Sequence, residues 1–242
     1  FLATGAVGLL WLLAWLAAFR LASDKVPPFG SRTLESGPVT RLLADGRVRW
    51  VLASRFLFDP VFYFYMFWIP QYLSRERGFS LQRIGNYYWI PFLALGVSNI
   101  LSGRLSDTLV RKGWAPRRAR TVLLTIAALV TPVSWLASVM PNAEWAIALM
   151  SCLMLAHGLW ISNFLGLLSD TFPSTAIATI TGLTGTAGGI GGILSNLAVG
   201  PLVDRWSFRP AFAVSGVLYP AALLLLLLGG LARERRPVSS TR

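Results

Sequence analysis

Residues 121–169 read TVLLTIAALVTPVSWLASVMPNAEWAIALMSCLMLAHGLWISNFLGLLS, and this stretch decides the fold class. Its only Asp, Glu, Lys or Arg is Glu144, which lies in a short polar turn between two apolar runs, 121–140 and 145–169. A helix needs about 20 predominantly apolar residues to cross the hydrocarbon of a bilayer. We therefore expect two consecutive membrane-spanning helices here.

Further apolar runs of similar length lie on both sides of this pair. Residues 1–19 are uncharged, and the other runs cover 56–74, 84–103, 171–203 and 210–232. The chain of 242 residues is 55% hydrophobic and only 13% charged, and its mean hydropathy is +0.60, which argues against a soluble domain. These features predict an all-α integral membrane protein with about seven transmembrane helices.

The basic residues indicate how the chain is oriented. It has 22 Lys and Arg against 10 Asp and Glu, a net charge of +12, and most of these bases fall in 20–49, 104–120 and 233–242. Bases near span ends favour the cytoplasmic side, so we expect these segments, and the carboxyl terminus, inside the cell inner (plasma) membrane. Because hydrophobic runs separate the bases, they form no continuous face for nucleic acid.

Composition divides the chain into four parts. Residues 22–49 mix Pro, Gly and Ser with charges, which is typical of a linker. We expect a transmembrane helix over 1–21, a cytoplasmic linker over 22–49, a six-helix bundle over 50–232 and a cytoplasmic tail over 233–242. The chain does not begin with Met, and no basic residues precede the first apolar run, so we expect a fragment rather than a secretory signal.

A spaced motif repeats within the six-helix part. Gly103-x-x-x-Asp107 and Gly200-x-x-x-Asp204 are 97 residues apart, and arginine follows both. If each motif closes the middle helix of a three-helix unit, the two units have opposite orientations in the membrane. Such inverted repeats are typical of secondary transporters, whose substrate sites lie near the midplane. A chance match is the alternative.

The stretch GRLSDTLVRKG (103–113) resembles the cytoplasmic loop signature of the major facilitator superfamily. Four other stretches resemble the proton-coupled organic-anion symporters of that superfamily, and most of all the hexuronate transporters: FLFDPVFYFYMFWIPQYL (56–73), LAHGLWISNF (155–164), SDTFP (169–173) and GLTGTAGGIGG (182–192). The resemblance implies a major-facilitator-type bundle, with the last helix of an amino-terminal half followed by the whole carboxy-terminal half.

The same resemblance implies a function. It points to the uptake of a sugar acid, such as glucuronate or galacturonate, with the proton as coupling ion and no other cofactor. The partners would be the lipid bilayer and an amino-terminal six-helix half, absent from this chain, which holds the family's principal protonatable carboxylates. Gly103, Asp107, Arg111 and Lys112 would form a conformational latch at the cytoplasmic mouth, without touching substrate.

One candidate site lies in the span 56–74 and just before it. Arg55 and Asp59 are one helical turn apart, so we expect an ion pair that is either structural or attracts and orients a substrate carboxylate. Tyr63 follows on the same side and can offer a hydroxyl to a sugar. Trp68 and Tyr72 lie nearer the outer end and fit an interfacial aromatic belt.

A second candidate site lies in the span 145–169. His157, Trp160 and Asn163 fall within about a third of the helix circumference. The imidazole and the amide can bond hydroxyls or a carboxylate, and the indole can stack on a pyranose ring. Hydrogen bonding between helices is the alternative for all three. As the only histidine, His157 could also take part in coupling.

Glycines crowd the stretch 182–192, and the pairs Gly185/Gly189 and Gly188/Gly192 favour close helix packing. A phosphate-binding loop is excluded, because no GK[ST] follows. The single Cys152 leaves no disulfide and no metal-ligand spacing, so we expect no metal.

Alternatives to the hexuronate transporter differ in substrate or in class. The substrate could be an aldonate, a tartrate or an aromatic acid. A membrane transferase would need paired acids or a metal site, and the sequence offers neither, so we expect no enzyme. The chain could also be an inactive truncated remnant.

Overall fold

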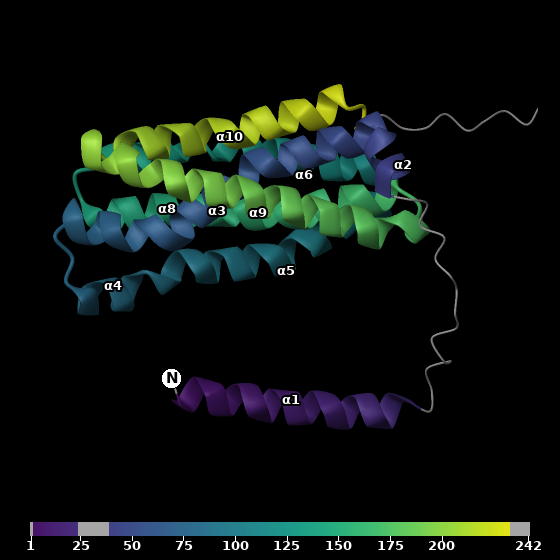
Figure 1. Ribbon diagram of the computed structural model, residues 1–242, viewed down its shortest axis with the longest axis horizontal. Coiled ribbons are helices and arrows are strands. Elements are labelled where there is room, and N and C mark those ends of the chain that lie inside the picture. Colours follow the sequence, from purple (N-terminus) through teal and green to yellow (C-terminus); the bar gives the residue numbers. More distant parts are fainter. Residues whose placement is uncertain (1, 24–38, 233–242) are drawn as a thin grey trace, which may run out of the picture. The chain divides into compact units, whose positions relative to one another are not determined.

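The computed structural model describes residues 2–23 and 39–232, and every regular element in these two ranges is a helix (Figure 1). The helices are α1 (Leu2–Ser23), α2 (Val39–Ala44), α3 (Gly46–Arg75), α4 (Leu81–Tyr87), α5 (Trp89–Arg111), α6 (Pro116–Val130), α7 (Val133–Val139), α8 (Ala143–Thr171), α9 (Ser174–Arg205) and α10 (Arg209–Leu228). The chain divides into two compact units, residues 1–36 with α1 and residues 37–242 with α2 to α10.

Length and apolarity show that the chain crosses a membrane more than once. In the described ranges, four helical segments are long and apolar enough to span: Pro116–Val139 (α6 with α7), α8, α9 and α10. Helices α3 and α5 have 30 and 23 residues but are not among these four segments. The prediction of an all-α, multi-pass membrane protein is confirmed, and the number of about seven spans stays a prediction.

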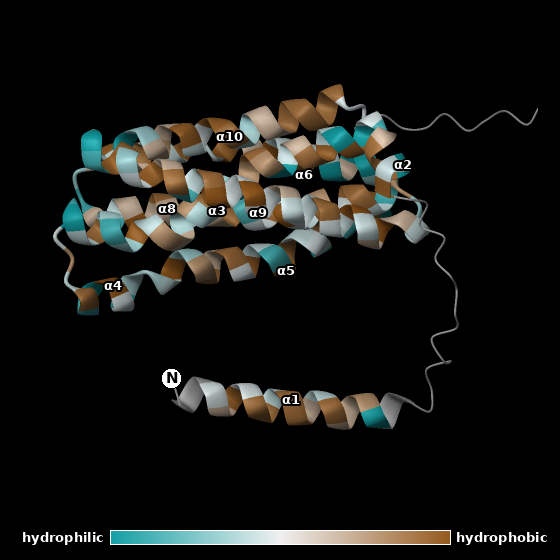
Figure 2. Ribbon diagram, viewed as in Figure 1, coloured by the Kyte–Doolittle hydropathy of each residue, from teal (hydrophilic) through white to brown (hydrophobic). Residues whose placement is uncertain are grey.

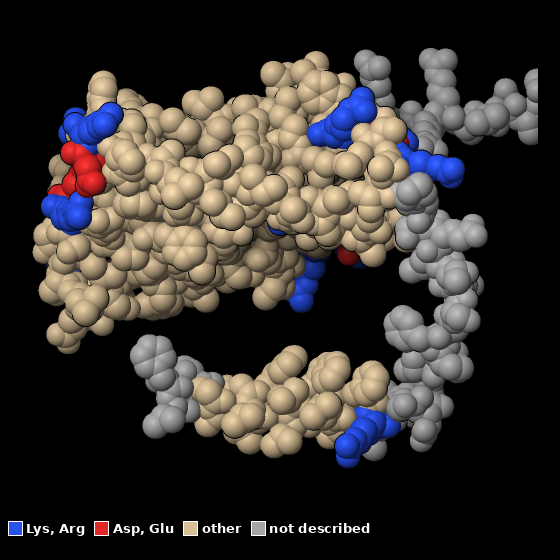
Figure 3. All heavy atoms as spheres, in the orientation of Figure 1, with Lys and Arg blue, Asp and Glu red and all other residues tan. Residues whose placement is uncertain are grey.

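The surface of the second unit fits a lipid environment. Large apolar side chains point outward, among them Leu129, Leu197 and Val217, which are 74%, 69% and 64% exposed. Hydrophilic residues gather toward the helix ends (Figure 2), and on the face shown in Figure 3 most charged atoms of this unit lie toward its two ends. An uncharged band between charged ends matches the hydrocarbon between two aqueous phases.

Two of the predicted spans are interrupted. The span predicted over 84–103 consists of α4 and α5, which meet at Tyr88, and the one over 121–140 consists of α6 and α7, which are separated by Thr131 and Pro132. Proline lacks an amide hydrogen and its ring crowds the preceding turn. Its effect depends on context, because α3 continues through Pro60 and Pro70.

The linker predicted over 22–49 is partly helical. It contains α2 and the first residues of α3, where the Asp45 side chain caps the helix by accepting a hydrogen bond from the Arg47 amide at 2.8 Å. The predicted boundary at residue 50 therefore lies inside α3, because linker composition does not reveal a capping residue. Residues 24–38 and the predicted tail 233–242 lie outside the described residues.

The internal repeat extends from the two short motifs to whole helices. Shifting α3 by 97 residues gives 143–172, which matches α8, and shifting α6 gives 213–227, which lies within α10. Packing is reciprocal: α9 lies along α3 as α5 lies along α8, and α10 packs on α3 as α6 packs on α8. On α3 and α8, Phe62 contacts His157 and Phe58 contacts Phe164, so these equivalent helices run antiparallel. The predicted inverted repeat is confirmed.

Small residues allow the closest helix contacts. On α9, a Cβ atom at Gly191 would lie 2.4 Å from the Phe56 carbonyl oxygen, and one at Gly188 or Gly192 would overlap the side chain of Asp59 or Tyr63 on α3. The other predicted pair behaves differently, because Gly185 and Gly189 have no such neighbour within 4 Å in the described structure. Among the described residues, therefore, only one of the two glycine faces packs against a neighbouring helix.

We expect Gly191→Ala to destabilise the protein by about 1–3 kcal/mol, because its methyl group would meet the backbone of α3, which cannot turn aside as a side chain can. Gly185→Ala is the matched control on the same helix, and it should be neutral or stabilising, since alanine favours a helix by about 1 kcal/mol over glycine. Thermal unfolding of the purified variants in detergent measures both. Equal unfolding midpoints for the two variants would contradict the packing of α9 on α3.

Candidate functional site

The predicted pair on α3 is present. Arg55 Nε lies 3.0 Å from Asp59 Oδ2, and the two side chains are 18% and 11% exposed. The Arg55 guanidinium also lies over the rings of Phe58 and Phe164, 5.7 and 5.8 Å from their centroids. The side chains belong to the middle of a 30-residue helix, where an ion pair is expensive and marks a candidate functional position.

Tyr63 lies one turn beyond Asp59 and lines a hollow of about 500 Å³ together with Asn196 and Gly189 of α9. Its ring stacks on Phe67 at 6.1 Å between centroids. Within the described ranges its hydroxyl makes no hydrogen bond. A free hydroxyl beside a hollow could contact a ligand.

The three predicted residues of α8 are buried and point toward different neighbours. The His157 ring stacks on Phe62 of α3, 4.9 Å between centroids, and its Nδ1 is hydrogen-bonded to the Tyr219 hydroxyl of α10. Asn163 instead donates from Nδ2 to Ser102 Oγ on α5 at 2.8 Å. The three residues therefore have different packing partners, because helices pack on more than one side of α8, and a shared substrate site stays a prediction.

Trp160 is fully buried between the rings of Phe58 and Tyr219, with centroids 5.5 and 5.2 Å from its own. These rings leave no room for a pyranose to stack on the indole in this conformation. However, Trp160 Nε1 and Asn163 Oδ1 are buried without a hydrogen-bond partner among the described residues. Buried polar groups normally find a partner, so both atoms could bond water or a ligand, and their substrate contacts stay a prediction.

Sequence reasoning missed several of these neighbours. Tyr219 of α10 is hydrogen-bonded to His157 of α8. The only signal for it in the sequence is its position before Pro220, inside an apolar run. Ser98, Ser102 and Ser106 recur every four residues and are all buried on α5, a spacing that predicts a helix-packing stripe. Tyr72 is also buried, against Phe212, so the expectation that it belongs to an interfacial belt is wrong.

The residues of the predicted latch make few contacts. Asp107 is exposed and has no ion-pair partner in the described structure, and Arg111 bonds only to the Thr108 hydroxyl there, at 3.0 Å. The repeat equivalent of Asp107 differs, because Asp204 pairs with Arg75 at 3.4 Å. The two ends of the repeat are therefore not equivalent.

A different ion pair joins the helices at the Asp107 end. Arg120 Nε of α6 lies 2.5 Å from Asp170 Oδ2 of α8, and Arg120 also donates to Ser106 of α5 at 3.2 Å. The guanidinium lies where a side chain at Gly166 would stand. Arg117 donates to the Asp170 carbonyl oxygen at 2.8 Å. This cluster joins the ends of three helices.

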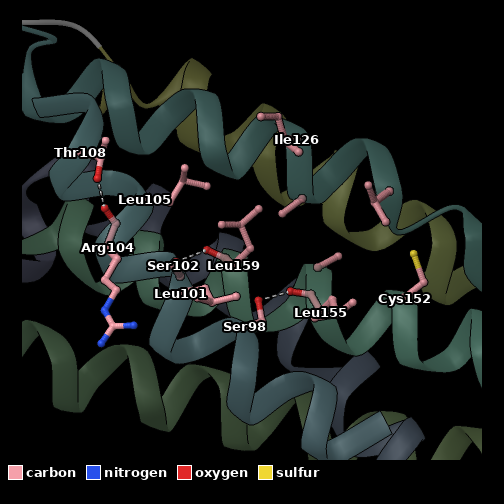
Figure 4. A pocket seen from close by; sticks show the side chains of 13 residues that line it. Ser98, Leu101, Ser102, Arg104, Leu105, Thr108, Ile126, Cys152, Leu155 and Leu159 are labelled. Carbon is pink, nitrogen blue, oxygen red and sulfur yellow. Dashed lines mark hydrogen bonds between the residues drawn. The ribbon is translucent and has the colours of Figure 1, made fainter. Parts of the chain in front are cut away.

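A first lateral groove, of about 590 Å³, lies between α5, α6 and α8. Its surface is mainly apolar, with groups such as Leu101, Leu105 and Leu159, and its lining also includes Ser98 and Arg104 (Figure 4). A second groove of about 360 Å³ lies between α3, α9 and α10. Four lining positions of α5 recur in α9 at the offset of 97: Ser98/Ser195, Leu101/Ala198, Ser102/Val199 and Leu105/Leu202. These two lateral grooves are products of the repeat, and their apolar linings do not suit a sugar acid.

Membrane helices in two inverted repeats are typical of a secondary transporter. The family model described as Major Facilitator Superfamily matches residues 1–196. The chain belongs to this superfamily.

Three relatives illustrate the similarity. The D-galactonate transporter of Escherichia coli O6:H1 is 28% identical, over 95% of this chain and 59% of that protein. The hexuronate transporter of Escherichia coli K12 is 26% identical, over 90% and 54%, and a probable galactarate/D-glucarate transporter of Bacillus subtilis is 28% identical, over 81% and 43%. The chain spans about half the length of the curated relatives it matches. The family and these relatives are transporters, not enzymes, which confirms the expectation of no enzyme.

We expect Arg55→Ala to destabilise the protein by roughly 3–5 kcal/mol, because it leaves the Asp59 carboxylate buried and unpaired. The double variant Arg55→Ala with Asp59→Ala removes both charges and should recover most of this loss. Unfolding midpoints of the purified proteins in detergent test the comparison. A double variant as unstable as the single one would show that the pair does not depend on mutual charge compensation.

Proposed function

We propose that this chain is the carboxy-terminal half of a proton-coupled symporter that takes up a sugar acid by alternating access. The observation that carries the proposal is the Arg55–Asp59 pair, held at mid-depth where α9 packs on α3. Membership of the Major Facilitator Superfamily and the named activities of the relatives support it.

A carboxylate that leaves water for the interior of a bundle needs a cation or strong donors to replace its hydration. Arg55 supplies the charge, while Asp59 orients the guanidinium or exchanges a proton. Tyr63 has a hydroxyl that no described group occupies, and Trp160 and Asn163 each have one buried atom without a partner. Together these groups could hold an anion that also carries hydroxyls.

The relatives narrow the substrate class. Galactonate, hexuronate, galactarate and glucarate are the substrates named for them, and all are six-carbon acids with several hydroxyl groups. A hexuronate is the first candidate, and an aldonate is the second because of the D-galactonate relative. The symporter would lie in the inner membrane, with the segment 104–120 on the cytoplasmic side. Its amino-terminal half would supply the carboxylates for proton coupling.

The loop after α5 would act as the latch. Asp107 is exposed and unpaired among the described residues, whereas Asp204 already has Arg75. A carboxylate left without a partner in one half can bind the other half in one conformation and release it in the next. Arg111 and Lys112 add cations to the same loop.

Uptake of labelled glucuronate or galactonate by cells that make the complete carrier tests the function. We expect uptake that an uncoupler of the proton gradient abolishes. Tyr63→Phe should weaken binding of the sugar acid by about tenfold, near 1.4 kcal/mol, because it removes only the hydroxyl. Its unfolding midpoint should not change, since the ring contacts remain. Absence of sugar-acid uptake by the wild-type carrier would refute the proposal.

The latch predicts a separation of transport from binding. Asp107→Asn should slow transport strongly and leave sugar-acid affinity nearly unchanged, because it alters the populations of two states rather than the site. Asp170→Asn is the matched comparison at the same end, and it should lower the unfolding midpoint by breaking the pair with Arg120. Normal transport by Asp107→Asn would contradict the latch and would mean that the loop has only a structural role.

A further inference from the structure

A polar pair lies on α5 and α8, outside the groups considered so far. Ser162 Oγ of α8 donates to Asn99 Oδ1 of α5 at 3.2 Å. Asn99 is exposed and Ser162 is partly exposed. In the part of the chain that the structure describes, no group accepts a hydrogen bond from the Asn99 amide nitrogen. Within the described residues, the pair therefore leaves both N–H donors of Asn99 and the acceptor lone pairs of Ser162 Oγ unused.

The pair lies close to the depth of the Arg55–Asp59 ion pair. On α8, Ser162 lies between Trp160 and Phe164, two residues from each. Trp160 contacts Phe58 of α3, and Phe164 lies under the Arg55 guanidinium. Since a helix rises 1.5 Å per residue, Ser162 is within about 3 Å of those contacts along the helix axis. Around the axis it lies about 160° from both residues, on the side of α8 that meets α5.

The pair also lies on the side of α5 that faces away from the lateral groove. Leu101 lines the groove between α5, α6 and α8, and Asn99 does not. Two residues are about 160° apart around a helix of 3.6 residues per turn, so Asn99 and Leu101 point in nearly opposite directions. On the surface of α5 between these two directions, Ser98 and Ser102 donate hydrogen bonds to carbonyl oxygens of α8 and join the two helices.

An exposed amide in the middle of a membrane helix is unfavourable against lipid, and such groups face a bundle interior or a water-filled cavity. The surface of α5 around Leu101 is apolar and suits contact with lipid. The Asn99 side therefore faces water or the rest of the carrier. At the other end of this side, the Tyr88 hydroxyl donates to the Met66 carbonyl oxygen at 3.0 Å and joins the start of α5 to α3.

We propose that Asn99 and Ser162 form the hydroxyl-binding edge of the sugar-acid site, with Arg55 as its carboxylate-binding edge. The proposal rests on the function proposed above. Helix α8 contacts both α3 and α5, so a substrate held at both edges would lie across α8. An amide and a hydroxyl side by side match neighbouring hydroxyls of a polyhydroxylated acid, which an aliphatic or aromatic acid lacks.

Cysteine accessibility in the complete carrier tests where Asn99 faces. In a carrier without native cysteines, Cys152 included, Asn99→Cys is compared with Leu101→Cys, its matched control on the same helix. A membrane-impermeant, water-soluble thiol reagent should modify the first variant at least about tenfold faster, because thiolate chemistry needs water. A hexuronate or galactonate should slow that reaction. Equal rates, or no protection by a sugar acid that the carrier binds, would overturn the proposal.

Substrate selectivity tests what Asn99 does. For the wild-type carrier, affinity should fall on going from a sugar acid to an analogue that lacks one of the hydroxyls at this edge. Asn99→Ala should lose about tenfold in affinity for the sugar acid and much less for that analogue, so the selectivity shrinks. Unchanged affinity in Asn99→Ala would overturn the proposal with the transport function intact. A wild-type carrier that binds no sugar acid would overturn both, while the labelling rates would still separate water-facing from lipid-facing positions.

Discussion

The close approach of α9 to α3 is the constraint on which the candidate site depends. Glycines at 188, 191 and 192 leave space that the Asp59 carboxylate, the Phe56 carbonyl and the Tyr63 ring occupy. The helix backbone thereby covers Asp59 on one side, and the guanidinium of Arg55 compensates its charge from the same helix. Larger side chains on α9 would separate the helices and admit lipid to a charge that lipid cannot solvate.

The repeat-related contact, that of α5 with α8, solves the same packing problem with other chemistry. Where α5 meets α8, the close contact is at Gly158, and serines of α5 donate to carbonyl oxygens of α8. Hydrogen bonds of this kind stabilise helix contacts in a membrane, because a hydroxyl group there has no water to bond. One of these two contacts therefore contains a charged pair, and the other contains neutral hydrogen-bonding groups. A sugar acid has both kinds of group.

Local patterns in the sequence predicted the features that depend on neighbours in the chain. Apolar runs gave the helices, and the one-turn spacing of Arg55 and Asp59 gave their ion pair. Features that depend on distant segments were not accessible: Trp160 is enclosed by α3 and α10, and Arg120 reaches Asp170 fifty residues away. The direction of a side chain around a buried helix depends on which helix packs there, and hydropathy carries no such information.

The inverted repeat has a consequence for the surrounding lipid. Helices α5 and α9 run antiparallel, since each is parallel to its partner in the α3–α8 pair. Their lateral grooves both lie toward the carboxyl end of the lining helix, so they are displaced toward opposite leaflets. Two grooves of common ancestry are thereby exposed to two different lipid mixtures wherever the leaflets differ in composition. Selection on acyl-chain fit can then act on each groove separately, and it can do so without changing the surroundings of Arg55 and Asp59.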